Sequence, residues 1–135
     1  MYIHVLGCRK LYAAFKGLTT VIYKLQSQMM DVFRYVTATG KDVLGGWLAE
    51  LKDARTRAKI IARIDRLSVD NFGDCKALGG GLFELRIDWG PGYRVYYASA
   101  GKACVLLLCG GAKSRQSSDI RRALEYLNDY KERTP

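Results

Sequence analysis

Hydrophobic positions recur at helical spacing in two stretches of the first half of the chain. The first stretch holds Val43, Leu44, Trp47, Leu48 and Leu51, and the second holds Ile60, Ile61, Ile64 and Leu67. A break near Asp53 separates the two stretches. Because apolar residues three and four positions apart share one face of a helix, the spacing predicts two helices packed as a hairpin.

Hydrophobic and polar residues alternate in residues 82–89, LFELRIDW, which is the pattern of a half-buried strand. Residues 93–98, YRVYYA, follow a Gly-Pro-Gly turn and predict the next strand. Residues 103–109, ACVLLLC, form a continuous apolar run that suits a strand near the centre of the sheet. Together the three segments predict an antiparallel meander.

One strand and one helix complete the predicted domain. Residues 30–36, MDVFRYV, are rich in β-branched and aromatic residues and predict a first strand. The last helix is expected to be capped by Ser117 or Ser118. Its inward residues are predicted to be Ile120, Leu124 and Leu127.

The order β-α-α-β-β-β-α predicts one α+β domain over residues 30–135. We expect an antiparallel sheet that packs against an N-terminal helical hairpin and a C-terminal helix, with the helices on one face. Residues 1–29 form a basic extension, in which apolar residues from Leu11 to Leu25 predict an amphipathic helix. The alternative interpretation is that Met29 or Met30 is the true initiator.

Charge narrows the classes of partner. The chain carries 22 Lys and Arg against 13 Asp and Glu, a formal net charge of +9, which favours RNA, DNA or an acidic peptide. His4 is the only histidine and the four cysteines lack C-x-x-C spacing, so we expect no metal and no cofactor. Without an 18-residue apolar run or a signal-peptide pattern, the sequence predicts a cytoplasmic protein.

Basic residues recur at helical spacing on the second predicted helix. Arg55, Lys59, Arg63 and Arg66 are separated by four, four and three residues, so they are expected to share one face opposite the isoleucines. Such a face can follow the phosphates of a nucleic acid. The alternative is an ordinary solvated helix surface.

The polar face of the meander carries a second basic group. If the hairpin is centred near Pro91, Arg86 and Arg94 lie across from each other on neighbouring strands. Two like charges side by side favour an anion between them, which predicts a phosphate site. The alternative is that Glu84 and Asp88 neutralise the two arginines.

Further candidate residues follow the same strands. Tyr96 shares the polar face with Arg94, and Lys113 follows the central strand in a GGAKS turn whose amides offer a weak phosphate-binding motif. Tyr126 and Tyr130 on the last helix are candidates for stacking on a base or moving a proton. The alternative for both tyrosines is packing.

The segment LGGGLFELRIDWGPGYRVYYASAGKACVLLLCGGAKSRQSSD, residues 78–119, resembles the RelE/ParE toxin superfamily, especially HigB-like addiction module killer proteins. ELRI, GPGYRVYY and LLLCGGAKS are the most specific pieces. DVFRYV, WLAELKD, RTRAKIIARIDRL and NFGD also match the pattern of that branch. The resemblance covers residues 30–132 and leaves out the basic extension.

This resemblance implies the toxin of a type II toxin–antitoxin system, whose partner is an antitoxin of the helix-turn-helix class. Operator DNA would be bound only through that antitoxin. RelE-like members are metal-independent endoribonucleases that cut mRNA on the ribosome and so inhibit translation. In this chemistry the ribose 2′-hydroxyl attacks the adjacent phosphate.

The resemblance also implies roles for individual residues. Arg86 and Arg94 would bind the scissile phosphate and stabilise its extra negative charge, and Lys113 would contact phosphate or assist proton transfer. These three are the expected catalytic residues. Because the predicted domain contains no histidine, the general base stays unassigned, with a lysine or tyrosine of lowered pKa as a candidate.

The expected RNA-binding residues are Lys59, Arg63, Tyr96, Tyr126 and Tyr130. Two other functions remain as alternatives. A ParE-like poison of DNA gyrase would have the same fold and basic surface without nuclease residues. A degenerate toxin would only bind its antitoxin.

Overall fold

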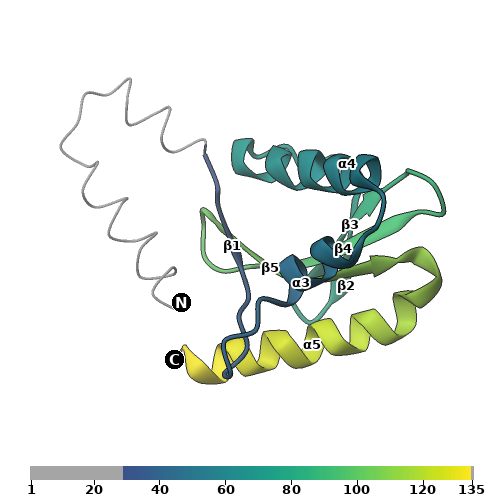
Figure 1. The fold of residues 1–135 in the computed structure, drawn as a ribbon. Helices are drawn as coiled ribbons and strands as arrows, with labels where there is room; N and C mark the ends of the chain where they lie inside the picture. The colour runs from purple at the N-terminus through teal and green to yellow at the C-terminus, as the bar shows by residue number, and fades with distance from the viewer. Residues whose placement is uncertain (1–28, 135) are drawn as a thin grey trace, which may run out of the picture.

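The computed structural model describes residues 29–134, so the predicted basic helix between Leu11 and Leu25 lies outside the described residues. This part of the chain forms three α-helices and five strands, whose arrangement is drawn in Figure 1. Their order is β1 (Asp31–Arg34), α3 (Val43–Glu50), α4 (Ala54–Asp65), β2 (Cys75–Gly79), β3 (Leu82–Ile87), β4 (Tyr93–Ser99), β5 (Cys104–Ala112) and α5 (Gln116–Arg133). Short 3-10 helices, η2 (Arg66–Val69) and η3 (Lys113–Arg115), follow α4 and β5. The α+β class is confirmed.

The strands form one sheet in the order β1-β5-β4-β3-β2. The meander of β3, β4 and β5 is antiparallel, as predicted, but β1 runs parallel to β5, so the sheet is mixed and the expected antiparallel sheet is wrong in this respect. Tight turns force neighbouring strands to be antiparallel. No tight turn joins β1 to β5, so the pattern of hydrophobic residues and turns does not determine the direction of β1.

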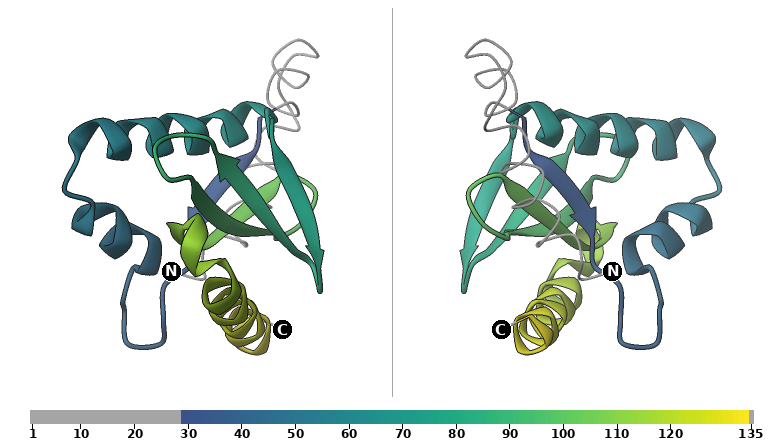
Figure 2. Two further views of the ribbon diagram at one scale, coloured as in Figure 1. Left: turned by 90° about the vertical axis from the view of Figure 1, so that its right-hand side faces the viewer. Right: turned by 90° about the vertical axis from the view of Figure 1, so that its left-hand side faces the viewer.

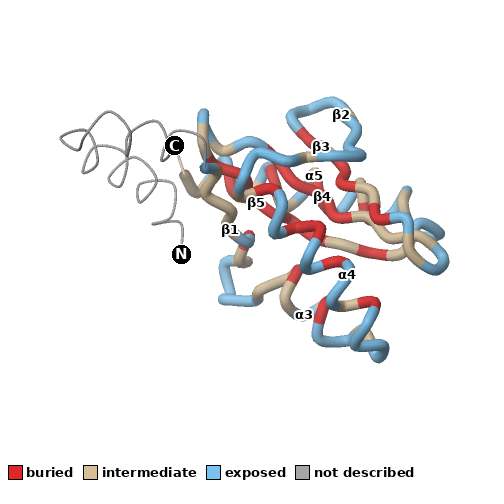
Figure 3. Tube along the Cα trace, turned by 90° about the horizontal axis from the view of Figure 1, so that it is seen from above, coloured by how far each residue is buried: buried red, intermediate tan, exposed pale blue. Residues whose placement is uncertain are grey.

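Strand β2 has no counterpart in the predicted order. Its residues, CKALG, are mostly exposed and carry little of the apolar alternation that marks a strand (Figure 3). It pairs with β3 at the edge of the sheet. The turn between them contains Gly79, Gly80 and Gly81, whose φ angles of +91°, +64° and +85° are accessible to glycine at little cost.

Helices cover both faces of the sheet, not one as expected. Helices α3 and α4 pack on one face over Leu85, Ile87 and Val95, and α5 packs on the other over Leu106 and Leu108 (Figure 2). Successive residues of a strand point to opposite faces, so the continuous apolar run of β5 needs a cover on each side. The domain therefore has three layers.

The two predicted helices, α3 and α4, are present. The predicted break is confirmed, since the Asp53 carboxylate caps α4 by accepting a hydrogen bond from the Arg55 amide at 3.0 Å. The two helices dock on different parts of the sheet, α3 beside β5 and β1 and α4 beside β3, so they form an open pair. None of the described helices is long and apolar enough to cross a membrane.

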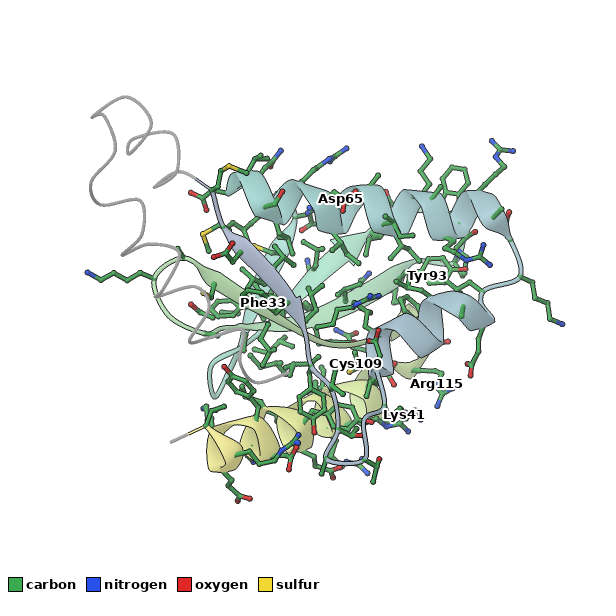
Figure 4. The ribbon with its side chains drawn as sticks, turned by 60° about the vertical axis from the view of Figure 1, so that its left-hand side comes forward. Phe33, Lys41, Asp65, Tyr93, Cys109 and Arg115 are labelled. Carbon is green, nitrogen blue, oxygen red and sulfur yellow. The ribbon has the colours of Figure 1, made fainter. Side chains whose placement is uncertain are left out.

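Helix α5 begins at Gln116, and neither predicted serine caps it. The capping position is Arg115, and the Ser118 hydroxyl instead donates to the Arg115 carbonyl at 3.0 Å. The preceding 3-10 turn, η3, leads directly from β5 into the helix. Figure 4 shows Arg115 at this junction, while Cys109 lies between the sheet and α5.

Candidate functional site

Arg86 and Arg94 lie directly opposite each other on β3 and β4, so the predicted pairing is confirmed. Their neighbours Leu85 and Val95 belong to the core beneath α3 and α4. Because side chains alternate along a strand, the two arginines stand on the face that α5 partly covers. The sheet thus brings two guanidinium groups to one place.

Glu84 is the acid that holds these arginines. Its side chain is 0% exposed, and its Oε1 lies 3.1 Å from Nε of Arg86 and 4.0 Å from Nε of Arg94. The Gln116 amide donates to the other oxygen, Oε2, at 2.7 Å. A buried carboxylate is tolerated only with such charged and hydrogen-bonding partners. The alternative of a neutralising acid is therefore correct for Glu84, which forms an ion pair with each arginine.

The second acid beside Arg86 is Asp74 and not Asp88. An Asp74 carboxylate oxygen, Oδ1, lies 3.8 Å from Nη1 of Arg86 at an exposed position. Sequence alternation could not indicate this contact, because Asp74 lies in the connection before β2 and outside the predicted meander. An exposed pair at this distance contributes little to stability.

Lys113 stands beside Arg94, as the candidate site requires. Its backbone amide donates to the Gly92 carbonyl at 2.9 Å. A Cβ on Gly92 would lie 3.4 Å from Cβ of Lys113 and 3.9 Å from Nη1 of Arg94, so both side chains flank the same glycine. Three cations therefore gather at the adjoining ends of β3, β4 and β5.

The three cations differ in their access to solvent. The side chain of Arg86 is 35% exposed and that of Arg94 only 11%, whereas Lys113 is exposed. An anion from solution would meet Arg86 and Lys113 first and reach Arg94 at the floor of the site. With three cations against the two carboxylates of Glu84 and Asp74, the site keeps a surplus of positive charge.

Two predicted RNA-binding tyrosines are buried. Tyr96 is 0% exposed and Tyr130 is 8% exposed in the core beneath α5, so neither can stack on a base. Burial raises the pKa of both hydroxyl groups, which argues against proton transfer near neutral pH. Packing, the alternative stated for Tyr130, is correct. Alternation placed Tyr96 on the polar face, but α5 covers that part of the face.

Tyr126 is half-buried and stacks on Tyr35, with ring centroids 5.0 Å apart. It lies ten residues beyond Gln116, which corresponds to about 15 Å along a helix. The structure therefore separates Tyr126 from the arginines.

Arg63 does not share the exposed face of α4, in contrast to the prediction. It is 8% exposed, and its Nη2 donates to the carbonyls of Phe72 at 2.5 Å and Asp74 at 3.3 Å. A helix turns about 100° per residue, so eight residues from Arg55 place Arg63 roughly 80° around the helix, beside buried Ile64. Arg63 therefore secures the loop before β2.

The GGAKS segment is not a phosphate-binding loop. Gly110 and Gly111 belong to β5, where their backbones pair with β4. A Cβ at Gly110 would collide with the Trp47 ring, and one at Gly111 would collide with the Asp119 carboxylate. These glycines make room for side chains from α3 and α5, which is a packing role.

Lys59 lies on the other face of the sheet, in a group that includes a tryptophan. Its Nζ lies 5.0 Å from the Trp89 ring centroid, and Cζ of Arg55 lies 5.7 Å from the same ring. Trp89 also donates from Nε1 to the Thr56 hydroxyl at 3.1 Å. Sequence analysis missed Trp89 because alternation alone assigned it to the core.

A groove of about 300 Å³ lies between α3, α4 and β1. Its lining is mainly apolar and includes Leu44, Leu48, Ile61 and Ile64. None of the three clustered cations lines it. The groove therefore is a separate feature on the face opposite the arginines.

Comparison with known proteins places the chain in a family. It matches the family described as Phage derived protein Gp49-like (DUF891) over residues 46–127, which include both arginines and Lys113. It is also 56% identical over 77 residues to an uncharacterized protein of Haemophilus influenzae (strain ATCC 51907 / DSM 11121 / KW20 / Rd). That alignment covers 57% of this chain and 78% of the Haemophilus protein. The chain belongs to the Phage derived protein Gp49-like family, a toxin-like family of addiction modules.

Proposed function

We propose that this chain is a RelE/ParE-type, HigB-like toxin that cleaves messenger RNA on the ribosome. Its family supports a toxin with an antitoxin partner. The observation that carries the endoribonuclease proposal is the direct pairing of Arg86 with Arg94, with Lys113 beside them. Arginines present planar forks of N–H donors that suit phosphate oxygens.

In the proposed reaction the ribose 2′-oxygen attacks the adjacent phosphorus. The bond from O2′ to phosphorus forms while the bond from phosphorus to O5′ breaks, which leaves a 2′,3′-cyclic phosphate and a 5′-hydroxyl. The 2′-hydroxyl releases its proton to a base, and O5′ takes up a proton. Arg86 and Arg94 stabilise the negative charge that accumulates on the phosphoryl oxygens, and Lys113 is the candidate proton donor to O5′.

Outside the cleavage site, Lys59 and Arg55 contribute phosphate contacts along the RNA. Both are exposed and lie over Trp89 at the turn that also leads to Arg94. Such contacts strengthen binding through released counterions and weaken as salt rises. In this proposal Arg63, Tyr96 and Tyr130 stabilise the fold and do not contact the RNA.

The test is primer-extension mapping of cellular mRNA after brief induction of the full chain without its antitoxin. We expect new RNA ends within translated codons, reduced about 100-fold or more in Arg86→Ala, since loss of one charge-stabilising donor has roughly this effect. Lys102→Ala, at the exposed turn between β4 and β5, is the matched loss of a cation and should cleave normally.

Two outcomes would contradict the proposal. Equal cleavage by Arg86→Ala and the unaltered chain would show that Arg86 does not take part in RNA cleavage. Intact mRNA together with accumulating DNA breaks would assign the toxin to the gyrase-poison class. The proposed helix-turn-helix antitoxin is tested separately by co-purification with the product of the adjacent gene.

A further inference from the structure

We propose that Glu84 is a positioning residue that orients Arg86 and Arg94 toward a single phosphate group. This inference deepens the proposed function, because the phosphate is taken to be that of the RNA substrate. The binding of phosphate by the two guanidinium groups can be measured without any cleavage reaction, so the inference can be tested separately from the endoribonuclease activity.

One oxygen atom faces both arginines. Oε1 of Glu84 lies 3.1 Å from Nε of Arg86 and 4.0 Å from Nε of Arg94. Nε occupies one edge of a guanidinium plane, so a carboxylate held at that edge leaves the terminal nitrogens directed elsewhere. The Arg94 Nη1 donates to the Tyr93 carbonyl at 3.0 Å, which sets the plane of that group as well.

Glu84 is itself held firmly. The side chain is fully buried on β3, and the Gln116 amide at the start of α5 donates to its Oε2 at 2.7 Å. The same carboxylate thus connects the sheet, both arginines and the helix. A carboxylate with this many partners has little freedom to turn, so it transmits its orientation to the two guanidinium groups.

Charge gives the second part of the argument. Arg86 and Arg94 are directly opposed, and like charges at opposed positions of a sheet repel each other. Buried Glu84 offsets one of the two positive charges, whereas the exposed Asp74 beside Arg86 offsets little of the other because solvent screens it. The arrangement favours one phosphate monoanion or diester over a larger cluster of anions. The buried Nε of Arg94 has no hydrogen-bond partner among the described residues, so its 4.0 Å contact with Glu84 is an ion pair without a hydrogen bond.

The experiment uses the full chain with ¹⁵N-labelled arginine and follows the Nε–Hε resonances of Arg86 and Arg94 during titration with inorganic phosphate. We expect the two resonances to shift together with one dissociation constant. Glu84→Gln keeps the side-chain shape but removes the charge. Loss of this negative charge alone would strengthen anion binding. A positioning role therefore predicts that the two arginine resonances of Glu84→Gln no longer shift together but give separate dissociation constants.

Asp74→Asn is the matched control, because Asp74 approaches Arg86 from the solvent side and does not contact Arg94 in the described structure. In Asp74→Asn the resonances of Arg86 and Arg94 should still shift together with one dissociation constant. Thermal unfolding checks that Glu84→Gln is folded, and Glu84→Ala serves as a more severe second variant. A joint titration in Glu84→Gln, with unchanged or tighter affinity, would overturn the inference. So would a native chain in which phosphate shifts neither arginine resonance.

Cleavage assays on the same variants separate this inference from the proposed function. We expect Glu84→Gln to lose kcat about 10-fold or more with a smaller change in KM, because misoriented arginines affect the transition state most. If the native chain titrates jointly but cuts no RNA, the endoribonuclease proposal fails and the positioning role stands. If Glu84→Gln cuts and titrates normally, the positioning role fails and the endoribonuclease proposal stands.

Discussion

The two faces of one sheet differ in what they bury. On β3, Leu85 and Ile87 face an apolar core beneath α3 and α4, while Glu84 and Arg86 stand on the face toward α5. The first face stabilises the fold by removing apolar surface from water. The second keeps a buried charge and several polar groups, which gain less stability and provide the candidate site. A single strand thus supplies both functions through alternation.

The same contrast holds for unsatisfied polar groups. The Tyr96 hydroxyl and the Asp119 Oδ2 are both buried on the α5 face without a hydrogen-bond partner among the described residues. On the α4 face, Nη1 of Arg63 is one such atom among the described residues. The indole nitrogen of Trp89 on that face donates to the Thr56 hydroxyl, which in turn donates to Asp53 at 2.9 Å. The α5 face is therefore expected to respond to pH and to polar substitutions.

The largest expected effect is on the apolar face. Leu85 is 0% exposed, so Leu85→Ala should lower the free energy of unfolding by about 2–5 kcal/mol through lost burial and a cavity. Denaturant unfolding measures the change. Ile61→Ala, at a position that is 40% exposed, is the control and should have an effect below about 1 kcal/mol. Similar losses for both variants would contradict the assignment of Leu85 to the core.

A smaller effect is expected from two arginines on α4, Arg63 with a structural role and Arg55 with a proposed RNA contact. Arg63→Ala should lower the unfolding free energy by about 1–3 kcal/mol, because the Phe72 carbonyl loses its Arg63 donor and the Asp74 carbonyl keeps only the Arg86 amide. Arg55→Ala should leave stability within about 1 kcal/mol and reduce RNA affinity instead. Calorimetry and filter binding on the same samples compare the two. An unstable Arg55→Ala with a stable Arg63→Ala would reverse the assignment.

Local patterns predicted the part of the site formed by one hairpin. Arg86 and Arg94 could be paired from sequence because a short glycine turn and strict alternation determine which residues face each other. Glu84 was visible in the same pattern as a neutralising acid. Gln116 was not, because its contact with Glu84 depends on how α5 returns to the sheet.

The errors share a physical origin in tertiary packing. Tyr96 has the same alternation as Arg94, but only the part of the polar face away from α5 is open to solvent. Arg63 repeats at helical spacing, but a spacing of eight residues carries it toward the buried side of α4. The direction of β1 and the covering of both faces likewise depend on long connections. The roles of Lys59 and Lys113 stay predictions.

A pH-dependent effect is expected from Asp119 in the first turn of α5. Burial raises the pKa of this carboxyl group, although nearby Arg115 and Arg122 oppose the shift. The folded state then binds the proton more tightly than the unfolded state. The resulting stabilisation is complete below the ordinary pKa of about 3.9 and is lost as pH rises through the raised pKa.

Asp119→Asn removes this titration without changing the shape of the side chain. The variant should gain stability relative to the native chain as pH rises from acidic to neutral, because the neutral amide avoids the cost of burying a charge. Urea unfolding at several pH values measures the difference. If the unfolding free energy of the native chain instead rises relative to that of the variant as pH rises, Asp119 is stabilised as a carboxylate by the two arginines.

The smallest effect is expected at the Tyr96 hydroxyl, compared with that of Tyr35 in the same core. Tyr35 donates to Asp129 and accepts from Arg133 at 3.2 Å, so Tyr35→Phe should lower the unfolding free energy by about 1–3 kcal/mol. Tyr96→Phe removes a buried hydroxyl without a partner and should change it by less than about 1 kcal/mol, in either direction. Thermal unfolding of both variants gives the comparison. Equal losses would show that the Tyr96 hydroxyl is hydrogen-bonded through a buried water, which would remove one of the unsatisfied atoms that distinguish the α5 face.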